Sequence, residues 1–237
     1  GFLPYDADYN EWREPFLGGG SMSIYMARKR PDLKIWVNDL YKPLYNFWKS
    51  LQYDGQKMIE YIYNSTVQAK RNDNVRELFD LCKRDSVDEP EGYVQAAYFY
   101  ILNRCAFSGI ITNPGYSKQA GEQCLKLSII EKLFELSDLI KPWKITNLNY
   151  HNLLQNCPKT LVYLDPPYDI ESNLYGKKGH LHKRFSHKTF AEDCCMSTNM
   201  QLISYNDSDD VRIRFPGYTS ETFPLTYTMG KAGKYNE

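Results

Sequence analysis

Hydrophobic positions along this chain form two kinds of pattern. Longer stretches with apolar residues three and four apart predict helices, including one that starts near Pro43 and one around residues 187–196. Short apolar runs between these stretches predict strands at residues 33–37, 144–147, 161–164 and 201–205, and a Thr- and Tyr-rich stretch predicts one more at 218–227. Strands that alternate with helices indicate an α/β fold.

The pattern changes between residues 52 and 140, where helical spacing replaces the alternation of strands and helices. Inside this region, residues 108–123 are too polar for a core and long for a plain connector, which favours a functional segment. We therefore predict one α/β domain made of residues 1–51 and 141–237, and a mostly helical insertion of residues 52–140.

Charge and cysteine usage narrow the class of protein. The chain has 29 basic and 29 acidic residues, so only a local patch could attract nucleic acid, and residues 177–188 are its most basic stretch. The histidine spacing H-x-H-x4-H in that stretch is a weak metal site, and we predict no metal. Six cysteines without a C-x-x-C pair, and no signal peptide or membrane-length apolar run, predict an intracellular, cytoplasmic protein without membrane association.

The sequence Asp165-Pro166-Pro167-Tyr168 directly follows the predicted strand at 161–164. Neither proline has an N–H to offer a neighbouring strand, so the strand ends there. A carboxylate, a constrained backbone carbonyl and an aromatic ring then lie together at the edge where open α/β sheets bind ligands. This set could hold an exocyclic amine on a flat ring, and the alternative is a strand-ending turn with a solvated Asp.

Two earlier segments also fall at predicted carboxyl ends of strands. Gly18-Gly19-Gly20 permits close approach of a ligand to the backbone, before a helix whose expected N-cap is Ser21. Asp39 ends the next strand, where an acidic residue meets ribose hydroxyls in nucleoside-binding α/β folds. A flexible turn and a helix cap are the alternatives. Glu14 is a candidate acceptor for a ligand amino group, or a surface acid beside Arg13.

Four motifs follow one another along the chain: Glu14-Pro15-Phe16-x-Gly18-Gly19-Gly20-Ser21, a strand ending Asn38-Asp39, Asn103-Arg104-x-x-Phe107-x-Gly109, and Asp165-Pro166-Pro167-Tyr168. In this order they resemble the Dam family of S-adenosylmethionine-dependent DNA adenine N6-methyltransferases. The resemblance spans most of the chain. It implies a Rossmann-like methyltransferase sheet with helices on both faces, and a target-recognition domain with a hairpin in the inserted region.

The resemblance also implies which residues form the site. S-adenosylmethionine would be the cofactor, with S-adenosylhomocysteine as product, and Asn149 stands where the family usually has Asp. Asp165 and the Pro166 carbonyl would hold the N6 amine of a flipped adenine while Tyr168 stacks on its ring. The catalytic residues would be Asp165, Pro166, Pro167 and Tyr168. The cofactor-binding residues would be Glu14, Pro15, Phe16, Gly18, Gly19, Gly20, Ser21, Asp39, Asn149, Tyr150 and Asp165.

Double-stranded DNA is the partner that the resemblance implies. GATC-type members usually carry Arg where Thr112 stands, and Arg is best suited to bidentate guanine readout, so the recognition sequence is not predicted. A helix C-terminus with a stabilising cation is the alternative for Asn103-Arg104, and a solvated loop for residues 177–188. The DNA-binding residues would be Asn103, Arg104, Ser108, Thr112, Asn113, Lys177, Lys178, Lys183 and Arg184.

The function predicted from the sequence is site-specific methylation of adenine N6 by base flipping and direct attack, in a bacterial, phage or viral setting. Methylation of cytosine N4, a non-catalytic DNA-binding relative and a nucleotide-binding oxidoreductase are the alternatives. Asp165 favours adenine, and the glycine spacing argues against the oxidoreductase. A cognate restriction endonuclease is a candidate partner. The family's Gly/Lys-rich first segment and final apolar strand have no counterpart here, which predicts a chain with missing ends.

Overall fold

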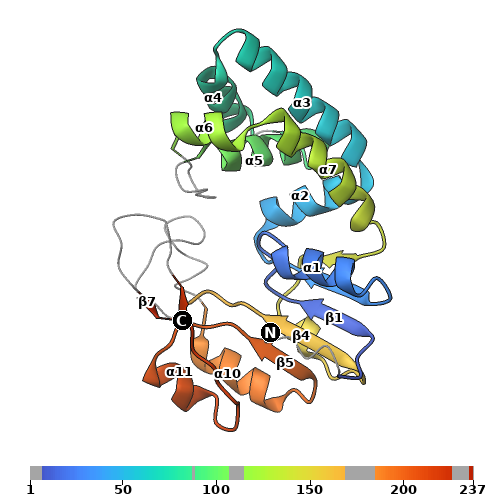
Figure 1. Ribbon diagram of the computed structural model, residues 1–237, viewed down its shortest axis with the longest axis vertical. Coiled ribbons are helices and arrows are strands. Elements are labelled where there is room, and N and C mark those ends of the chain that lie inside the picture. Colours follow the sequence, from blue (N-terminus) through green and yellow to red (C-terminus); the bar gives the residue numbers. More distant parts are fainter. Residues whose placement is uncertain (1–6, 87–88, 107–114, 169–184, 226–234, 237) are drawn as a thin grey trace. The chain divides into compact units, whose positions relative to one another are not determined.

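The computed structural model describes residues 7–86, 89–106, 115–168, 185–225 and 235–236. It contains a five-stranded sheet with the strand order β3-β2-β1-β4-β5 (Figure 1). β1 pairs in parallel with β2 and β4, and β4 pairs in parallel with β5. The strands are β1 Glu11–Glu14, β2 Lys34–Asn38, β3 Lys144–Thr146, β4 Thr160–Leu164 and β5 Met200–Ile203. The predicted Rossmann-like α/β fold is therefore confirmed.

One predicted strand is largely wrong. Residues 218–223 form no strand, and only β6 Pro224–Leu225 pairs, in antiparallel orientation with β7 Tyr235–Asn236. The Thr and Tyr residues that suggested a strand favour sheets because they pack on a half-buried surface. Residues 218–223 are exposed, so this packing is missing.

The sheet of the α/β unit is covered on two faces (Figure 1). Helix α1, Ser21–Lys29, packs against β1, where the buried Trp12 donates from Nε1 to Ser23 Oγ over 2.8 Å. The opposite face of β4 packs against α8, His151–Leu154, and α10, His187–Met196. Because side chains alternate along a strand, Trp12 and Glu14 point to the α1 face and Arg13 points to the other. Helix α11, Asp209–Arg214, follows β5.

Gly20, and not Ser21, is the N-cap of α1. Gly20 has a left-handed backbone with φ 68°, and its N–H donates to the Leu17 carbonyl over 2.7 Å. Ser21 is already the first helical residue, and the N-cap Gly20 has no side chain that could accept a hydrogen bond from the first turn. The predicted serine cap is wrong because a positive φ closes the turn one residue earlier, and glycine adopts that conformation without steric cost.

Arg13 of β1 connects α8 to the face of the sheet opposite α1 through hydrogen bonds. Its side chain is buried, and Nη1 donates to the carbonyls of Leu153, over 3.0 Å, and Gln155, over 2.7 Å. Nε pairs with Glu11 Oε1 at 2.6 Å, and the guanidinium lies over the Trp36 ring, 5.0 Å from its centroid. Carbonyls at the C-terminus of a helix lack intrahelical donors, and here Arg13 shares them with Asn199, which donates to the carbonyls of Leu154 and Gln155 over 3.1 Å.

The second part of the structure is helical. Its core contains the fully buried Met58, Ile62 and Ile101, and the rings of Phe47 and Tyr100 stack 5.9 Å apart. Its helices are α2 Lys42–Tyr53, α3 Gly55–Arg71, α4 Val75–Asp85, α5 Tyr93–Cys105, α6 Lys118–Cys124 and α7 Leu127–Leu139. Ser137 on α7 donates to the Leu51 carbonyl over 2.7 Å, which ties the end of α2 to α7.

The described chain divides into two compact units. One unit contains residues 1–38 and 148–237, and the other contains residues 39–147. The sequence placed the corresponding boundaries at residues 52 and 140. In the structure α2 begins before residue 52, and the second unit continues beyond the end of α7 to include β3. Among the helices of the described ranges, none is both long and apolar enough to span a membrane. All six cysteines are described, and all are free thiols.

We expect Arg13→Met to lower the free energy of unfolding of the α/β unit by about 3 kcal/mol, because it breaks a buried ion pair and removes the Arg13 donor from the buried Leu153 carbonyl. Arg84→Met is the matched control. Arg84 is exposed and pairs only with its neighbour Asp85, so its loss should cost less than about 1 kcal/mol. Urea unfolding followed by circular dichroism measures both, and equal losses would contradict the role given to Arg13.

Candidate active site

The strand order places a topological switch point between β1 and β4. From β1 the chain proceeds through β2 to β3 on one side, and then returns to β4 on the other side of β1. Connections that leave in opposite directions open a crevice at the carboxyl ends of the two strands, where α/β sheets bind ligands. β1 leads into Pro15–Gly20, and β4 leads into Asp165–Tyr168, so both predicted motifs start at this crevice.

The glycine segment after β1 has space beside it. Gly18 has a φ of 49°, which favours glycine for its backbone conformation alone. A Cβ built on Gly18 or on Gly19 would meet no atom within 4 Å. The backbone at these residues is therefore open to a bound group, and a side chain there would occupy that space.

Glu14, the last residue of β1, is a buried carboxylic acid. Its Oε2 accepts from the backbone N–H of Ser23, over 3.0 Å, and from the Ser23 hydroxyl. Burial is the main cause that raises the pKa of Glu14 to about 8. The charge of Asp165 raises this pKa further, whereas the hydrogen bonds from Ser23 lower it. Glu14 is only 3% exposed, so the alternative of a surface acid beside Arg13 is excluded.

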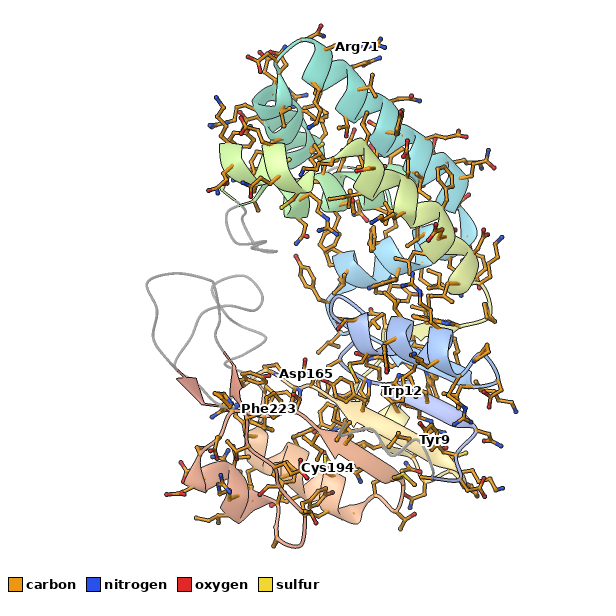
Figure 2. The ribbon with its side chains drawn as sticks, in the orientation of Figure 1. Tyr9, Trp12, Arg71, Asp165, Cys194 and Phe223 are labelled. Atoms are coloured by element: carbon orange, nitrogen blue, oxygen red, sulfur yellow. The ribbon has the colours of Figure 1, made fainter. Side chains whose placement is uncertain are left out.

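Asp165 lies where the chain leaves β4 (Figure 2). Its charge raises the pKa of Glu14, so the two carboxyl groups are close enough to interact. The pairing of β1 with β4 thus brings the first and last predicted motifs together. Asp165 is exposed, whereas the adjacent Pro166 is buried. The carboxylate is therefore accessible to a ligand, while the two prolines fix the backbone that follows it.

Asn38 organises the loops around the crevice and was missed by the sequence analysis as a site residue. Its side chain is buried, and Nδ2 donates to the carbonyls of Pro15, over 3.1 Å, and Leu148, over 2.9 Å. Its Oδ1 accepts from the N–H of Leu148 over 2.7 Å, and its carbonyl accepts from Leu17 over 2.9 Å. One amide thus fixes the segment after β1 to the segment before α8. The only sequence signal is an Asn at the end of a strand.

The acids and amides predicted to contact a cofactor also have structural roles. One oxygen of the Asp39 carboxylate accepts from the Tyr41 N–H over 2.8 Å, a turn that leads into α2. Asp39 is not the N-cap of α2, because Tyr41 occupies that position, so the predicted helix-cap alternative does not describe its role. Asn149 is exposed, and its Oδ1 accepts from the His151 N–H over 3.2 Å at the start of α8.

Phe16 and Tyr150, both predicted to bind the cofactor, lie together in an aromatic cluster. Their ring centroids are 5.6 Å apart, and Tyr150 is 5.4 Å from Phe190 of α10. The Tyr150 hydroxyl donates to Asp193 Oδ2 over 2.6 Å. Burial first, and then the Asp193 carboxylate, raise the pKa of Tyr150. The cluster joins the segment after β1 to α8 and α10.

Tyr168, the ring of the last motif, lies beside a second aromatic residue that the sequence analysis did not identify. Tyr205 follows β5, and its ring stacks on Tyr168 with centroids 6.4 Å apart and planes inclined by 22°. The Tyr205 hydroxyl is hydrogen-bonded to His187 Nδ1 at the start of α10. Tyr205 is the last residue of the strand predicted at 201–205. Because tyrosine is common in strands, the sequence gives no specific signal that this residue belongs to the site.

The predicted DNA-binding residues are only partly within the described chain. Asn103 and Arg104 lie in the last turn of α5, and the Arg104 guanidinium is 5.2 Å from the Tyr100 ring centroid. A cation in the last turn fits the helix C-terminus alternative. Beyond α5, Ala106 and Tyr116 form an antiparallel bridge, and the residues of the predicted hairpin between them, 107–114, lie outside the described residues. Ser108, Thr112, Asn113, Lys177, Lys178, Lys183 and Arg184 lie outside the described residues.

Comparison with known proteins gives one family match and two distant relatives. Residues 2–220 match the family of D12 class N6 adenine-specific DNA methyltransferases. The Type II methyltransferase M1.LlaDCHI of Lactococcus lactis is 23% identical over 192 residues, which cover 76% of this chain and 64% of the relative. The Type II methyltransferase M.MjaIII of Methanocaldococcus jannaschii is 25% identical over 180 residues, 69% of this chain and 60% of the relative. The chain thus spans less than two thirds of either relative.

The raised pKa of Glu14 predicts a pH-dependent stability. Between about pH 4.3, the ordinary glutamate value, and about pH 8, the folded chain holds a proton that the unfolded chain has lost. This contribution is fully present below about pH 4.3 and is lost as pH rises through 8. We expect Glu14→Gln to gain stability over the unmodified protein across this window, by on the order of 5 kcal/mol at pH 8.

Urea unfolding of both proteins at pH 5, 6, 7 and 8 measures the difference. Glu192→Gln, at an exposed acid of α10, is the control and should leave the pH profile unchanged. A Glu14→Gln profile parallel to that of the unmodified protein would show that another group causes the slope.

Proposed function

We propose, from the premise that this chain belongs to the family of D12 class N6 adenine-specific DNA methyltransferases, that it transfers a methyl group from S-adenosylmethionine to N6 of adenine in double-stranded DNA. The observation that carries the proposal is the switch point between β1 and β4. There the glycine segment and Asp165–Tyr168 leave adjacent parallel strands, so a methyl donor and a base could bind side by side.

The residues at the carboxyl end of β1 fit the methionine part of the donor. Open space beside Gly18 and Gly19 allows a bound group to approach the backbone. Among the described residues, no cation is one of the groups that shift the pKa of the buried Glu14, and a ligand ammonium group would favour its ionised form. The segment that joins β1 to α1 also contains Pro15 and Gly20, and α1 begins at Ser21. S-adenosylmethionine, when bound, supplies an electrophilic methyl group on a sulfonium.

Asp39, Asn149 and Tyr150 fit the nucleoside part of the donor. Asp39 follows β2, the next strand of the sheet, where a ribose hydroxyl pair meets an acid in related folds. The rings of Phe16 and Tyr150 supply an apolar wall for a purine, and the exposed amide of Asn149 can donate and accept hydrogen bonds.

Asp165 and Tyr168 would act on the base. The amine at adenine N6 is a poor nucleophile because its lone pair is delocalised into the ring. Acceptance of its two hydrogens by Asp165 and the Pro166 carbonyl localises that lone pair, and Pro167 fixes the backbone between them and Tyr168. Stacking on Tyr168 is worth about 1–3 kcal/mol for an extruded base. The nitrogen loses its proton after it gains the methyl group.

The helical unit of residues 39–147 is proposed to recognise the DNA target. Asn103 and Arg104 lie just before the antiparallel bridge of Ala106 and Tyr116, from which a hairpin could reach the DNA. The basic segment around Lys177–Arg184 would contact phosphates. Both relatives are named Type II methyltransferases, which supports a cytoplasmic role beside a restriction endonuclease. Cytosine N4 is the second candidate acceptor, since the same acceptors would hold its amine.

Asp165→Ala tests the proposed chemistry. We expect the rate of methyl transfer to fall by at least about 100-fold, because the amine loses its charged acceptor, while the affinity for S-adenosylhomocysteine changes by less than about threefold. Transfer of a radiolabelled methyl group to plasmid DNA and isothermal titration calorimetry measure the two quantities. Asp210→Ala, at an exposed acid of α11, is the control and should leave both unchanged.

Retained turnover in Asp165→Ala would rule out the assignment of this carboxylate. Sequencing of DNA from cells that express the chain distinguishes the acceptors, because N6-methyladenine and N4-methylcytosine give different signals. The same experiment identifies the recognition sequence, and N4-methylcytosine at the modified positions would replace the adenine proposal.

A further inference from the structure

Asp193 holds together two residues at the start of α8. Its Oδ2 accepts from the Tyr150 hydroxyl over 2.6 Å and lies 3.0 Å from His151 Nδ1. The Tyr150 and His151 rings stack on each other, with centroids 4.2 Å apart. The Asp193 side chain is 25% exposed, so the carboxylate is largely but not fully removed from water. A hydrogen bond to an ionised acceptor in such a place is stronger than one between neutral groups.

Helix α10 contacts Tyr150 through two side chains on one of its faces. Phe190 and Asp193 are three residues apart, which places them on the same side of a helix. Phe190 is fully buried and packs edge-on against Tyr150, with planes inclined by 72°. Asp193 fixes the opposite, polar end of the same ring. The ring is therefore held at its apolar body and at its hydroxyl, and both ends are fixed by one element.

The ring that is fixed in this way forms part of the proposed cofactor pocket. Tyr150 faces Phe16 of the segment after β1, at 5.6 Å between ring centroids. Rotation of Tyr150 would change the width of the aromatic wall and remove one of the rings that pack against Phe16. A side chain that must be ordered on binding costs roughly 0.5–1.5 kcal/mol, and one that is already ordered does not.

We propose that Asp193 is a positioning residue for cofactor binding, which acts through the Tyr150 hydroxyl to hold the ring in its binding orientation. This inference rests on the proposed function, because it assigns Tyr150 to the cofactor. Asp193 does not itself contact the reacting atoms. Its loss should weaken cofactor binding while methyl transfer at saturating cofactor remains unchanged.

A double-mutant cycle between Asp193 and Tyr150 tests the inference. We expect Asp193→Ala to raise the Kd for S-adenosylhomocysteine, and the KM for S-adenosylmethionine, by roughly three- to tenfold with kcat unchanged. Tyr150→Phe removes only the hydroxyl and should give an increase of the same size. The double variant should be no worse than either single variant, because the two changes remove one interaction.

Two further variants separate positioning from a structural role. Asp193→Asn keeps an oxygen that can accept from the Tyr150 hydroxyl, so its Kd should stay within about twofold of the unmodified protein. Glu192→Ala removes the exposed neighbouring acid, which lies 3.9 Å from Lys188, and should change neither binding nor turnover. Thermal unfolding of each variant shows which variants are folded. If Asp193→Ala does not fold, the comparison of Asp193→Asn with Tyr150→Phe tests the inference instead.

The possible results give distinct conclusions. Increases in Kd that multiply in the double variant would show that Asp193 acts independently of Tyr150, and would overturn the inference. So would an unchanged Kd in Asp193→Ala, or a fall in kcat with no change in KM. If the unmodified protein itself binds neither S-adenosylmethionine nor S-adenosylhomocysteine, the proposed function fails, whatever Asp193 does.

Discussion

The parallel pairing of β1 with β4 is the constraint on which the site depends. These strands are far apart in the sequence, and their register aligns Arg13 with Val162, so that their carboxyl ends finish side by side. The chain leaves one strand toward β2 and the other toward β5, which opens the crevice between them. The proximity of Glu14 to Asp165 is a consequence of this pairing. Glu14 is the last residue of β1, and Asp165 is the first residue after β4.

Buried polar groups maintain the geometry that the sheet establishes. Trp12 donates to Ser23, and Ser23 donates to Glu14, so a chain of hydrogen bonds runs between β1 and α1. On the opposite face Arg13 donates to the carbonyls of Leu153 and Gln155 at the end of α8. Such networks stabilise a structure only when each member is satisfied, and they then specify one arrangement of the surrounding loops. The segment that follows β1 is therefore supported from both faces of one short strand.

The sequence predicted the strands and helices with strong apolar patterns, such as 161–164 and 187–196, because burial determines both pattern and structure. It failed at residues 218–223, where strand-favouring residues have no surface to pack on, and at Ser21, where a glycine conformation decided the helix start. Motifs indicated Asp165 and Gly18. Contacts between distant residues, such as those of Asn38 and Asp193, depend on the folded backbone and leave no local pattern.

The hydrogen bonds of Asn38 also affect which part of the chain could be replaced by another sequence. Its amide binds Leu148, so the point where the chain leaves the α/β unit is joined to the point where it returns. Directly beyond, the Asp39 N–H donates to the Thr146 carbonyl and Asn147 donates to the Asp39 carbonyl. Residues 39–147 are thus a loop whose two ends are already closed. A different set of helices between residues 42 and 139 could therefore replace α2 to α7 while β3, at the end of this loop, stays paired in the sheet, which makes the helical region modular.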